Sequence, residues 1–340
     1  MGFFAVVIST ILTAIAATPG RGSLGPATEA MWELPTSSNK LAGILFLAHG
    51  CSHAATDFWE RSTACPTCLG LPEEVRIVKA ALRASYAVLA VSSIDRDSKC
   101  WNIDEDGPMV RDAIAAFRAN NAAALATAPL VAFGASSGGA LVLMLPSLIP
   151  GIQAVVSQIM AIPPHMLPSS MPPTLFVHMH RDARTSALVQ RCVKKLKQSG
   201  TPHAAALEVM PAKPTASFFM QRIERLTHES ATALHAALKK AKLLDEEGHL
   251  AIDPRRSAWR DAVRGAGGGL HEQLPGPGAG GAPDTLVSDE SAVSEALNVA
   301  YAMHEIVSDQ IEVTLAWAAK PTSSVPGAPA SPPLGDELRV

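Results

Sequence analysis

The sequence has few aromatic residues and few charges. Aromatic side chains make up 5% of the 340 residues and charged side chains 17%, whereas hydrophobic residues reach 48%. This composition excludes an intrinsically disordered chain and leaves core packing mainly to Ala, Val, Leu and Ile. Basic residues are not in excess, because 28 Lys and Arg face 31 Asp and Glu for a net charge of −3. We therefore expect no nucleic-acid partner.

Long hydrophobic runs are also scarce. One uncharged run, residues 3–17, ends in small residues before Pro19-Gly20. It is shorter than the roughly 20 residues of a spanning helix and matches the apolar region of a secretory signal, although no basic residue precedes it. We expect residues 1–22 to be a signal peptide or a short anchor, which directs the chain to the secretory pathway or the extracellular space. An organelle-targeting segment and a buried helix are the alternatives, and we expect membrane contact only through this segment if it is uncleaved.

Cysteine is sparse and unevenly spread. The five cysteines are Cys51, Cys65, Cys68, Cys100 and Cys192, so at least one thiol must be free. The first four fit two disulfides in an oxidising compartment, reduced thiols in the cytosol, or a zinc site completed by His53. The zinc hypothesis lacks a second closely spaced ligand pair beyond Cys51-x-His53, so we favour disulfides and expect no metal.

From residue 41 short apolar runs alternate with amphipathic stretches. This alternation predicts an α/β fold, with a mostly parallel sheet flanked by helices over residues 40–211. The expected strands are 41–48, 87–94, 130–134, 152–160, 174–179 and 205–210, and the expected helices are 72–84, 108–119, 138–148 and 185–198.

The alternation stops after residue 211. Residues 215–263 are predicted to form a helical insertion that caps a pocket, with Phe218, Phe219 and Met220 either lining the pocket or packed in an ordinary core. The glycine-rich stretch 265–285 and the proline-rich tail 320–340 are expected to be disordered. A last helix is predicted over about 289–318, so the main domain extends over residues 40–318.

The most specific motif is G-x-S-x-G, formed by Gly134, Ser136 and Gly138 between an apolar strand and an apolar helix. This context is typical of a nucleophile elbow, in which the serine occupies a strained turn and the flanking glycines avoid collisions. We therefore predict Ser136 as a nucleophile. A chance glycine turn is the alternative.

A second motif follows the strand ending at Ala48. His49-Gly50-Cys51 suits an oxyanion hole, for which the backbone amides of Cys51 and Ser137 would supply two donors. Because only amides are needed, we expect His49 to brace the loop rather than to take part in catalysis.

Asp182 lies just beyond the predicted strand 174–179 and is the expected partner of a catalytic histidine. A surface Asp paired with Arg181 or Arg184 is one alternative. A metal site in His178-x-His180-x-Asp182 is another, although the expected second His after the Asp is replaced by Ala183.

The base is predicted to be His304, which follows the last strand and precedes a closing helix. The prediction requires the helical pattern to break near residues 302–303, because an unbroken helix would bury His304 along its apolar stripe. His249 and His228 are the other candidates for the base.

The order of these motifs resembles that of the α/β-hydrolase superfamily: a strand followed by His-Gly, a strand followed by G-x-S-x-G and a helix, a strand followed by Asp, and a late His. The resemblance extends over roughly residues 40–211 and 298–317. The segments 47–59, 70–74 and 134–139 are similar to a little-characterised branch in plants and algae, and the HGC segment resembles polyhydroxybutyrate-depolymerase-like and feruloyl-type esterases. The resemblance implies an α/β-hydrolase fold and a serine hydrolase that cleaves a small-molecule or lipid-like ester without a cofactor. Because the superfamily also contains receptors, a ligand-binding module without catalysis is the alternative.

Overall fold

The computed structural model describes residues 19–36, 40–201, 203–224, 226–266, 270, 274 and 286–320. Residues 1–18 of the expected signal segment, most of the glycine-rich stretch 265–285 and the tail 321–340 lie outside the described residues. The three corresponding expectations therefore stay predictions.

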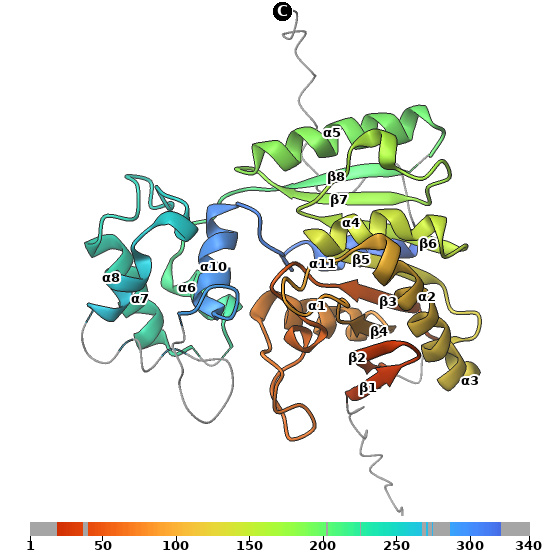
Figure 1. Cartoon of the computed structure of the whole chain (residues 1–340). Helices are drawn as coiled ribbons and strands as arrows, with labels where there is room; N and C mark the ends of the chain where they lie inside the picture. The colour runs from red at the N-terminus through yellow and green to blue at the C-terminus, as the bar shows by residue number, and fades with distance from the viewer. Residues whose placement is uncertain are drawn as a thin grey trace, which may run out of the picture.

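One eight-stranded sheet forms the centre of the molecule, in the order β1-β2-β4-β3-β5-β6-β7-β8 (Figure 1). The strands from β4 to β8 in this order are parallel, and β2 runs antiparallel to both of its neighbours. The predicted α/β fold class, a mostly parallel sheet flanked by helices, is confirmed. The strands are β1 Gly20–Leu24, β2 Ala27–Glu33, β3 Gly43–Ala48, β4 Tyr86–Val91, β5 Leu130–Ala135, β6 Ile152–Gln158, β7 Thr174–Met179 and β8 Ala204–Val209.

The first two strands correct the predicted start of the sheet at residue 40. β1 and β2 form an antiparallel hairpin whose turn contains Gly25 at φ +56°, and β2 pairs with β4. Only Ala30 and Met31 of this hairpin are adjacent buried residues, so its apolar signal is weak beside the hydrophobic run that precedes it. The strand β1 includes Gly20–Gly22, the last residues of the expected signal segment.

Helices cover both faces of the sheet because alternate strand residues point to opposite sides. In β3, Leu45 and Leu47 join the core beneath α1 and α11, while Ile44 and Phe46 join the core beneath α2, α4 and α5. The bounds are α1 Pro72–Arg83, α2 Ile103–Asn120, α3 Ala122–Leu125, α4 Ser137–Met144, α5 Ala183–Gln198 and α11 Ile311–Ala319.

A separate helical layer lies beside the sheet (Figure 1). It contains α6 Ala216–Arg222, α7 His228–Lys240, α8 Trp259–Arg264 and α10 Ala292–Tyr301, which share their own apolar core. Phe219 is fully buried in that core, Phe218 packs against it and Met220 is exposed. The ordinary-core alternative therefore holds for Phe219.

The single helix predicted over 289–318 is wrong, because the chain breaks between α10 and α11. Ala302 at φ +57° ends α10 in the left-handed region, and His304 at φ +44° keeps the chain out of helical geometry. Nine residues then separate the two helices. Within the described ranges, no helix has both the length and the apolar character needed to cross a membrane.

Candidate active site

Ser136 occupies the sharp turn between β5 and α4. Its backbone angles, φ +50° and ψ −120°, are strained for a residue with a side chain. A Cβ added to Gly134 would collide with the carbonyl of Gly138, and one added to Gly138 would collide with the carbonyls of Ala48 and His49. The two glycines thus permit the close approach of β5, α4 and the end of β3 that the G-x-S-x-G pattern predicts.

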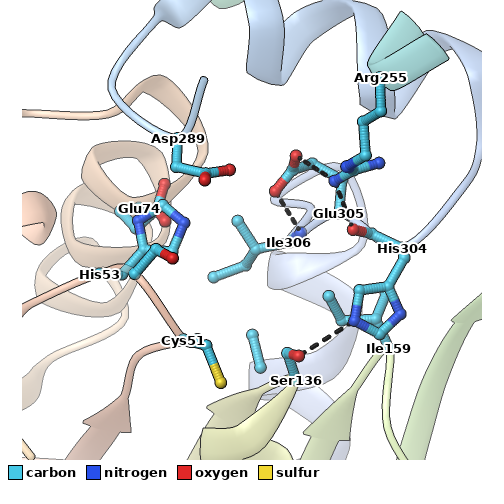
Figure 2. Close-up of a pocket in the computed structure, with 13 residues that line it drawn as sticks. Cys51, His53, Glu74, Ser136, Ile159, Arg255, Asp289, His304, Glu305 and Ile306 are labelled. Carbon is cyan, nitrogen blue, oxygen red and sulfur yellow. Dashed lines mark hydrogen bonds and ion pairs between the residues drawn. The ribbon is translucent and has the colours of Figure 1, made fainter. Parts of the chain in front are cut away.

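The structure brings Ser136, His304 and Asp182 together, although the serine and the histidine are 168 positions apart in the sequence. The Ser136 Oγ lies 3.0 Å from His304 Nε2 (Figure 2), and His304 Nδ1 lies 2.9 Å from Asp182 Oδ2. Because a carboxylate only accepts hydrogen bonds, the proton on the neutral imidazole belongs on Nδ1. Nε2 is then free to accept the hydrogen of the Ser136 hydroxyl.

Asp182 uses its two oxygens for different partners. While Oδ2 faces His304, Oδ1 accepts the backbone N–H of Thr185 at 3.1 Å and caps α5. Burial alone would raise the pKa of this carboxyl group, but the hydrogen bonds from His304 and Thr185 outweigh it and lower its pKa to about 2. The carboxylate thus stays ionised at neutral pH, and its side-chain partner is His304 rather than Arg181 or Arg184.

Two arginines contact the segment that carries His304. The backbone N–H of Arg181 donates to the Ala302 carbonyl at 3.0 Å, which connects this segment to the loop that carries Asp182. Arg255, from the helical layer, donates to the carbonyls of Met303 and His304, both at 2.8 Å, and pairs with Glu305 at 3.1 Å. The break in the helical pattern therefore has defined partners on both sides.

The expected oxyanion donors lie at the turns that surround Ser136. Cys51 follows Gly50 after β3, and Ser137 begins α4. Among the described residues, neither amide N–H donates a backbone hydrogen bond, whereas the neighbouring N–H of Ser52 donates to Ser98. Both amides are thus available to an oxyanion. A disulfide between Cys51 and Cys100 fixes the first turn.

His49 is a buried neutral histidine. Its Nδ1 lies 2.7 Å from the Gly50 carbonyl, its Nε2 accepts the N–H of Ser93 at 3.1 Å, and its ring packs on Trp101. Burial lowers the pKa of its imidazole to about 3. These bonds use both ring nitrogens, so His49 holds the turn after β3.

The cysteines form two disulfides, Cys51–Cys100 and Cys65–Cys68, and Cys192 is free and buried. This arrangement leaves no thiolate for the zinc hypothesis. His53 instead pairs with Asp57 at 3.0 Å. Burial would lower the pKa of His53, but the bond to Asp57 and nearby carboxylates raise its pKa to about 9.

The alternative catalytic and metal residues lie elsewhere. His178 contacts Ser186, and His180 contacts Glu208, so these two histidines have separate partners. No group of three His, Cys, Asp or Glu side chains in the described part of the chain has the geometry to hold a metal ion. His228 is the first residue of α7 and His249 belongs to an exposed turn, and neither lines the pocket at Ser136.

Ser136 and His304 open into a cavity of about 260 Å³. Figure 2 shows His304 next to Ser136 on one side of this pocket and His53 with Glu74 on the other. Of its lining residues, the sequence predicts Gly50, Cys51, Ser136 and His304 for the site, and Phe218, Phe219 and Met220 are absent from the lining. The lining residues that the sequence did not predict for the site are Ser52, His53, Glu74, Ala135, Ile159, Arg255, Asp289, Glu305 and Ile306.

No family model matches the chain, and no curated protein matches it in sequence. Solved structures that it resembles include the α/β serine hydrolase XC6422 of Xanthomonas campestris, at 13% identity and a TM-score of 0.37 over 58% of this chain and 85% of that one. Carboxyl esterase 2 of Tuber melanosporum aligns at 13% identity and a TM-score of 0.42, over 59% and 78%. The esterase Est2 of Thermogutta terrifontis aligns at 14% identity and a TM-score of 0.41, over 59% of this chain and 83% of that one.

Proposed function

We propose that this protein is a serine hydrolase that cleaves an ester-type bond through an acyl-enzyme. The observation that carries the proposal is the continuous chain of contacts from Ser136 through His304 to Asp182, at 3.0 Å and 2.9 Å. A strained serine, a base within hydrogen-bond reach and a carboxylate that orients the base together make up an activated nucleophile.

In the proposed reaction, Ser136 Oγ attacks the acyl carbon while its proton passes to His304 Nε2. The amides of Cys51 and Ser137 hold the oxyanion, and each such donor contributes roughly a hundredfold to the rate. The protonated His304 then gives its proton to the departing alcohol. Water, deprotonated by the same histidine, attacks the acyl-enzyme and releases the acid and free Ser136. Asp182 stabilises the imidazolium in both halves of the reaction.

The alternative, a binding module without catalysis, requires that His304 lie out of reach of Ser136. Proton transfer needs a separation close to hydrogen-bond length, and 3.0 Å satisfies that condition. The geometry therefore favours the hydrolase over the binding module.

Labelling with a fluorophosphonate probe tests the proposal. We expect the wild-type protein to be labelled, and labelling to be lost in both Ser136→Ala and His304→Ala. His249→Ala is the matched control, because His249 lies in an exposed turn away from the pocket, and it should label normally. An unlabelled wild-type protein would support the binding module, whereas normal labelling of His304→Ala would move the base to another histidine.

For the compartment, we propose the secretory pathway or the extracellular space. The two disulfides support this proposal, because such bonds persist in oxidising compartments and are rare in the cytosol. Mass analysis of the secreted and cytosolic fractions of cells that express the chain tests it. Recovery of the protein only in the cytosol, with reduced Cys51 and Cys100, would contradict it.

A further inference from the structure

The turn after β3 carries one of the two proposed oxyanion donors, the backbone N–H of Cys51. The Gly50 carbonyl accepts the His53 N–H at 3.3 Å, so Cys51 and Ser52 are the central residues of a tight turn. Ser52 stands at φ +69°, in the left-handed region that favours glycine. Because a residue with a side chain keeps such a conformation only where its surroundings hold it, this turn needs a constraint from elsewhere in the fold.

The constraint comes from the loop between β4 and α2, to which Cys51 is joined by its disulfide with Cys100. Beside this disulfide, the Ser52 N–H donates to the Ser98 carbonyl at 3.0 Å and the Lys99 ammonium donates to the Ser52 carbonyl at 3.3 Å. Ser52 and Ser98 are exposed, so water competes for these hydrogen bonds. The disulfide is therefore the contact of this turn that water cannot replace.

The backbone is strained on both sides of the disulfide. Lys99, which precedes Cys100, stands at φ +53°, just as Ser52, which follows Cys51, stands at φ +69°. Each cysteine thus has a neighbour in a conformation that side chains disfavour. Breaking the bond between the two sulfurs lets both segments relax, and the Cys51 N–H moves with its turn.

The parts of the chain on either side of this turn have contacts of their own. His49 Nε2 accepts the N–H of Ser93 at 3.1 Å, and the His49 carbonyl accepts the indole N–H of Trp101 at 2.8 Å. On the other side, the Ala55 N–H donates to the Ser92 hydroxyl at 3.0 Å. Loss of the disulfide therefore displaces the short turn between these anchors and leaves the sheet in place.

The two disulfides differ in how far a reductant can reach them. Cys51 and Cys100 are partly exposed, and Cys51 lines the pocket next to Ser136 (Figure 2). Cys65 and Cys68 are 3% and 0% exposed. Because thiol–disulfide exchange requires a thiolate to reach a sulfur atom, a soluble dithiol should reduce Cys51–Cys100 well before Cys65–Cys68.

We propose that Cys100 is a positioning residue for the oxyanion hole, and that its disulfide with Cys51 makes the hydrolase fully active only in the oxidised state. The inference rests on the proposed hydrolase function and adds its regulation. One thiolate of a dithiol attacks a sulfur of the disulfide and expels the other cysteine as a thiolate. The second thiol of the reductant then displaces the first cysteine. The protein gains two electrons and two protons as two thiols, and the reductant becomes a disulfide.

The test measures hydrolysis of p-nitrophenyl acetate before and after mild reduction with dithiothreitol, with alkylation and mass analysis to show which cysteines are free. Removal of one oxyanion donor lowers kcat about a hundredfold, so its displacement should lower kcat at least tenfold. KM should change little, because the oxyanion exists only in the transition state. Reoxidation should restore kcat.

Cys100→Ser keeps the Cys65–Cys68 bond and removes only the disulfide at the turn. We expect its kcat to equal that of the reduced wild type and to be insensitive to dithiothreitol. Cys192→Ser is the matched control, because Cys192 is a free, buried cysteine, and it should respond to dithiothreitol as the wild type does. An unchanged kcat in both the reduced wild type and Cys100→Ser, or unfolding of both as seen by circular dichroism, would overturn the inference.

Hydrogen exchange tests the constraint without catalysis. The N–H groups of Ser52 and His53 are hydrogen-bonded in the turn, so reduction should speed their exchange at least tenfold and leave the amides of α1 unchanged. Unchanged exchange would overturn the inference even if the protein hydrolyses esters. An oxidised wild type that neither hydrolyses the ester nor reacts with a fluorophosphonate would instead reject the hydrolase function, and with it the catalytic role of the turn.

Discussion

Asp182 combines two tasks in one side chain, since it orients His304 and caps α5. Asp182→Asn keeps the shape and the oxygen that caps the helix, but it removes the charge that stabilises the imidazolium and favours the wrong tautomer of His304. We expect kcat/KM for an ester to fall about a thousandfold or more, with little loss of stability. Steady-state kinetics alongside urea unfolding check this. A fall of less than tenfold would contradict the assigned role.

Arg255 acts through the histidine rather than on the substrate. Its two donors hold the carbonyls of Met303 and His304, next to the Asn298–Glu305 hydrogen bond from α10. We expect Arg255→Ala to lower kcat about tenfold, because small displacements of a catalytic group are costly. Arg255→Lys should recover only part of the loss, since an ammonium cannot reproduce the two-pronged guanidinium geometry.

The rate of fluorophosphonate labelling across pH measures this effect without a substrate. Arg256→Ala is the control, because Arg256 is the exposed neighbour of Arg255 and does not line the pocket. If Arg255→Ala and Arg256→Ala label at the same rate at every pH, Arg255 does not position His304.

At this scale, the residues that the sequence predicts are those fixed by local rules. Ser136 follows from its glycines and flanking elements, and Asp182 follows from its place after a strand. His304 required knowledge of chain order, and its place next to Ser136 depends on Arg255 and on the backbone angles of Ala302. Glu74 and Asp289 have no local signature, because only the folded chain brings α1 and the segment before α10 to one pocket.

Among the elements, the turn between β5 and α4 is the most constrained. Because a Cβ on Gly138 would overlap the carbonyls of Ala48 and His49, Gly138→Ala must push β3 away from α4. We expect the free energy of unfolding to fall by about 1–3 kcal/mol and hydrolysis to be lost, because the Cys51 and Ser137 amides are displaced together. Urea unfolding followed by circular dichroism measures the first effect.

Gly22 provides the comparison. A Cβ there would lie 3.7 Å from the Trp32 ring, an ordinary contact, so Gly22→Ala should not lower the stability. Equal stability of the Gly138→Ala variant and the wild type would show that the elbow tolerates a side chain at this position.

The elements also show where sequence patterns lose information. Fully buried parallel strands have continuous apolar runs, so the strands from β3 onward are predicted within a few residues. β1 and β2 are half exposed at a sheet edge, where this signal fades. The helical period of the sequence continues across the break, because Val299, Val307 and Ile311, spaced by eight and four residues, all join the same core. Periodicity alone could not locate the left-handed residues in between.

In the whole molecule, buried carboxyl groups join the sheet to the helical layer. Glu73, at the start of α1, pairs with Arg222 of α6 and accepts hydrogen bonds from Ser308. Its backbone N–H donates to a carboxyl oxygen of Glu295 from α10. Glu74 lies next to this junction. Burial raises its pKa to about 7, and burial also raises the pKa values of Glu295 and Glu305.

This junction predicts how the stability of the molecule depends on pH. The pKa of Glu74 is higher in the folded protein than its ordinary value of 4.5, so the folded state holds its proton to higher pH than the unfolded state does. The contribution of Glu74 to stability is therefore fully present below about pH 4.5 and is lost as the pH rises towards 7. The groups that face it are His53, Asp57, Glu295 and Glu305, and His53 stays protonated throughout because its pKa is about 9.

We expect the free energy of unfolding of the wild type to fall between pH 5 and 7.5, and Glu74→Gln to flatten this fall by an amount of the order of 1–3 kcal/mol. Urea unfolding at half-unit pH steps measures both curves, with Glu312→Gln as the exposed control that should follow the wild type. Parallel curves for the wild type and Glu74→Gln would mean that Glu74 is already ionised at pH 5.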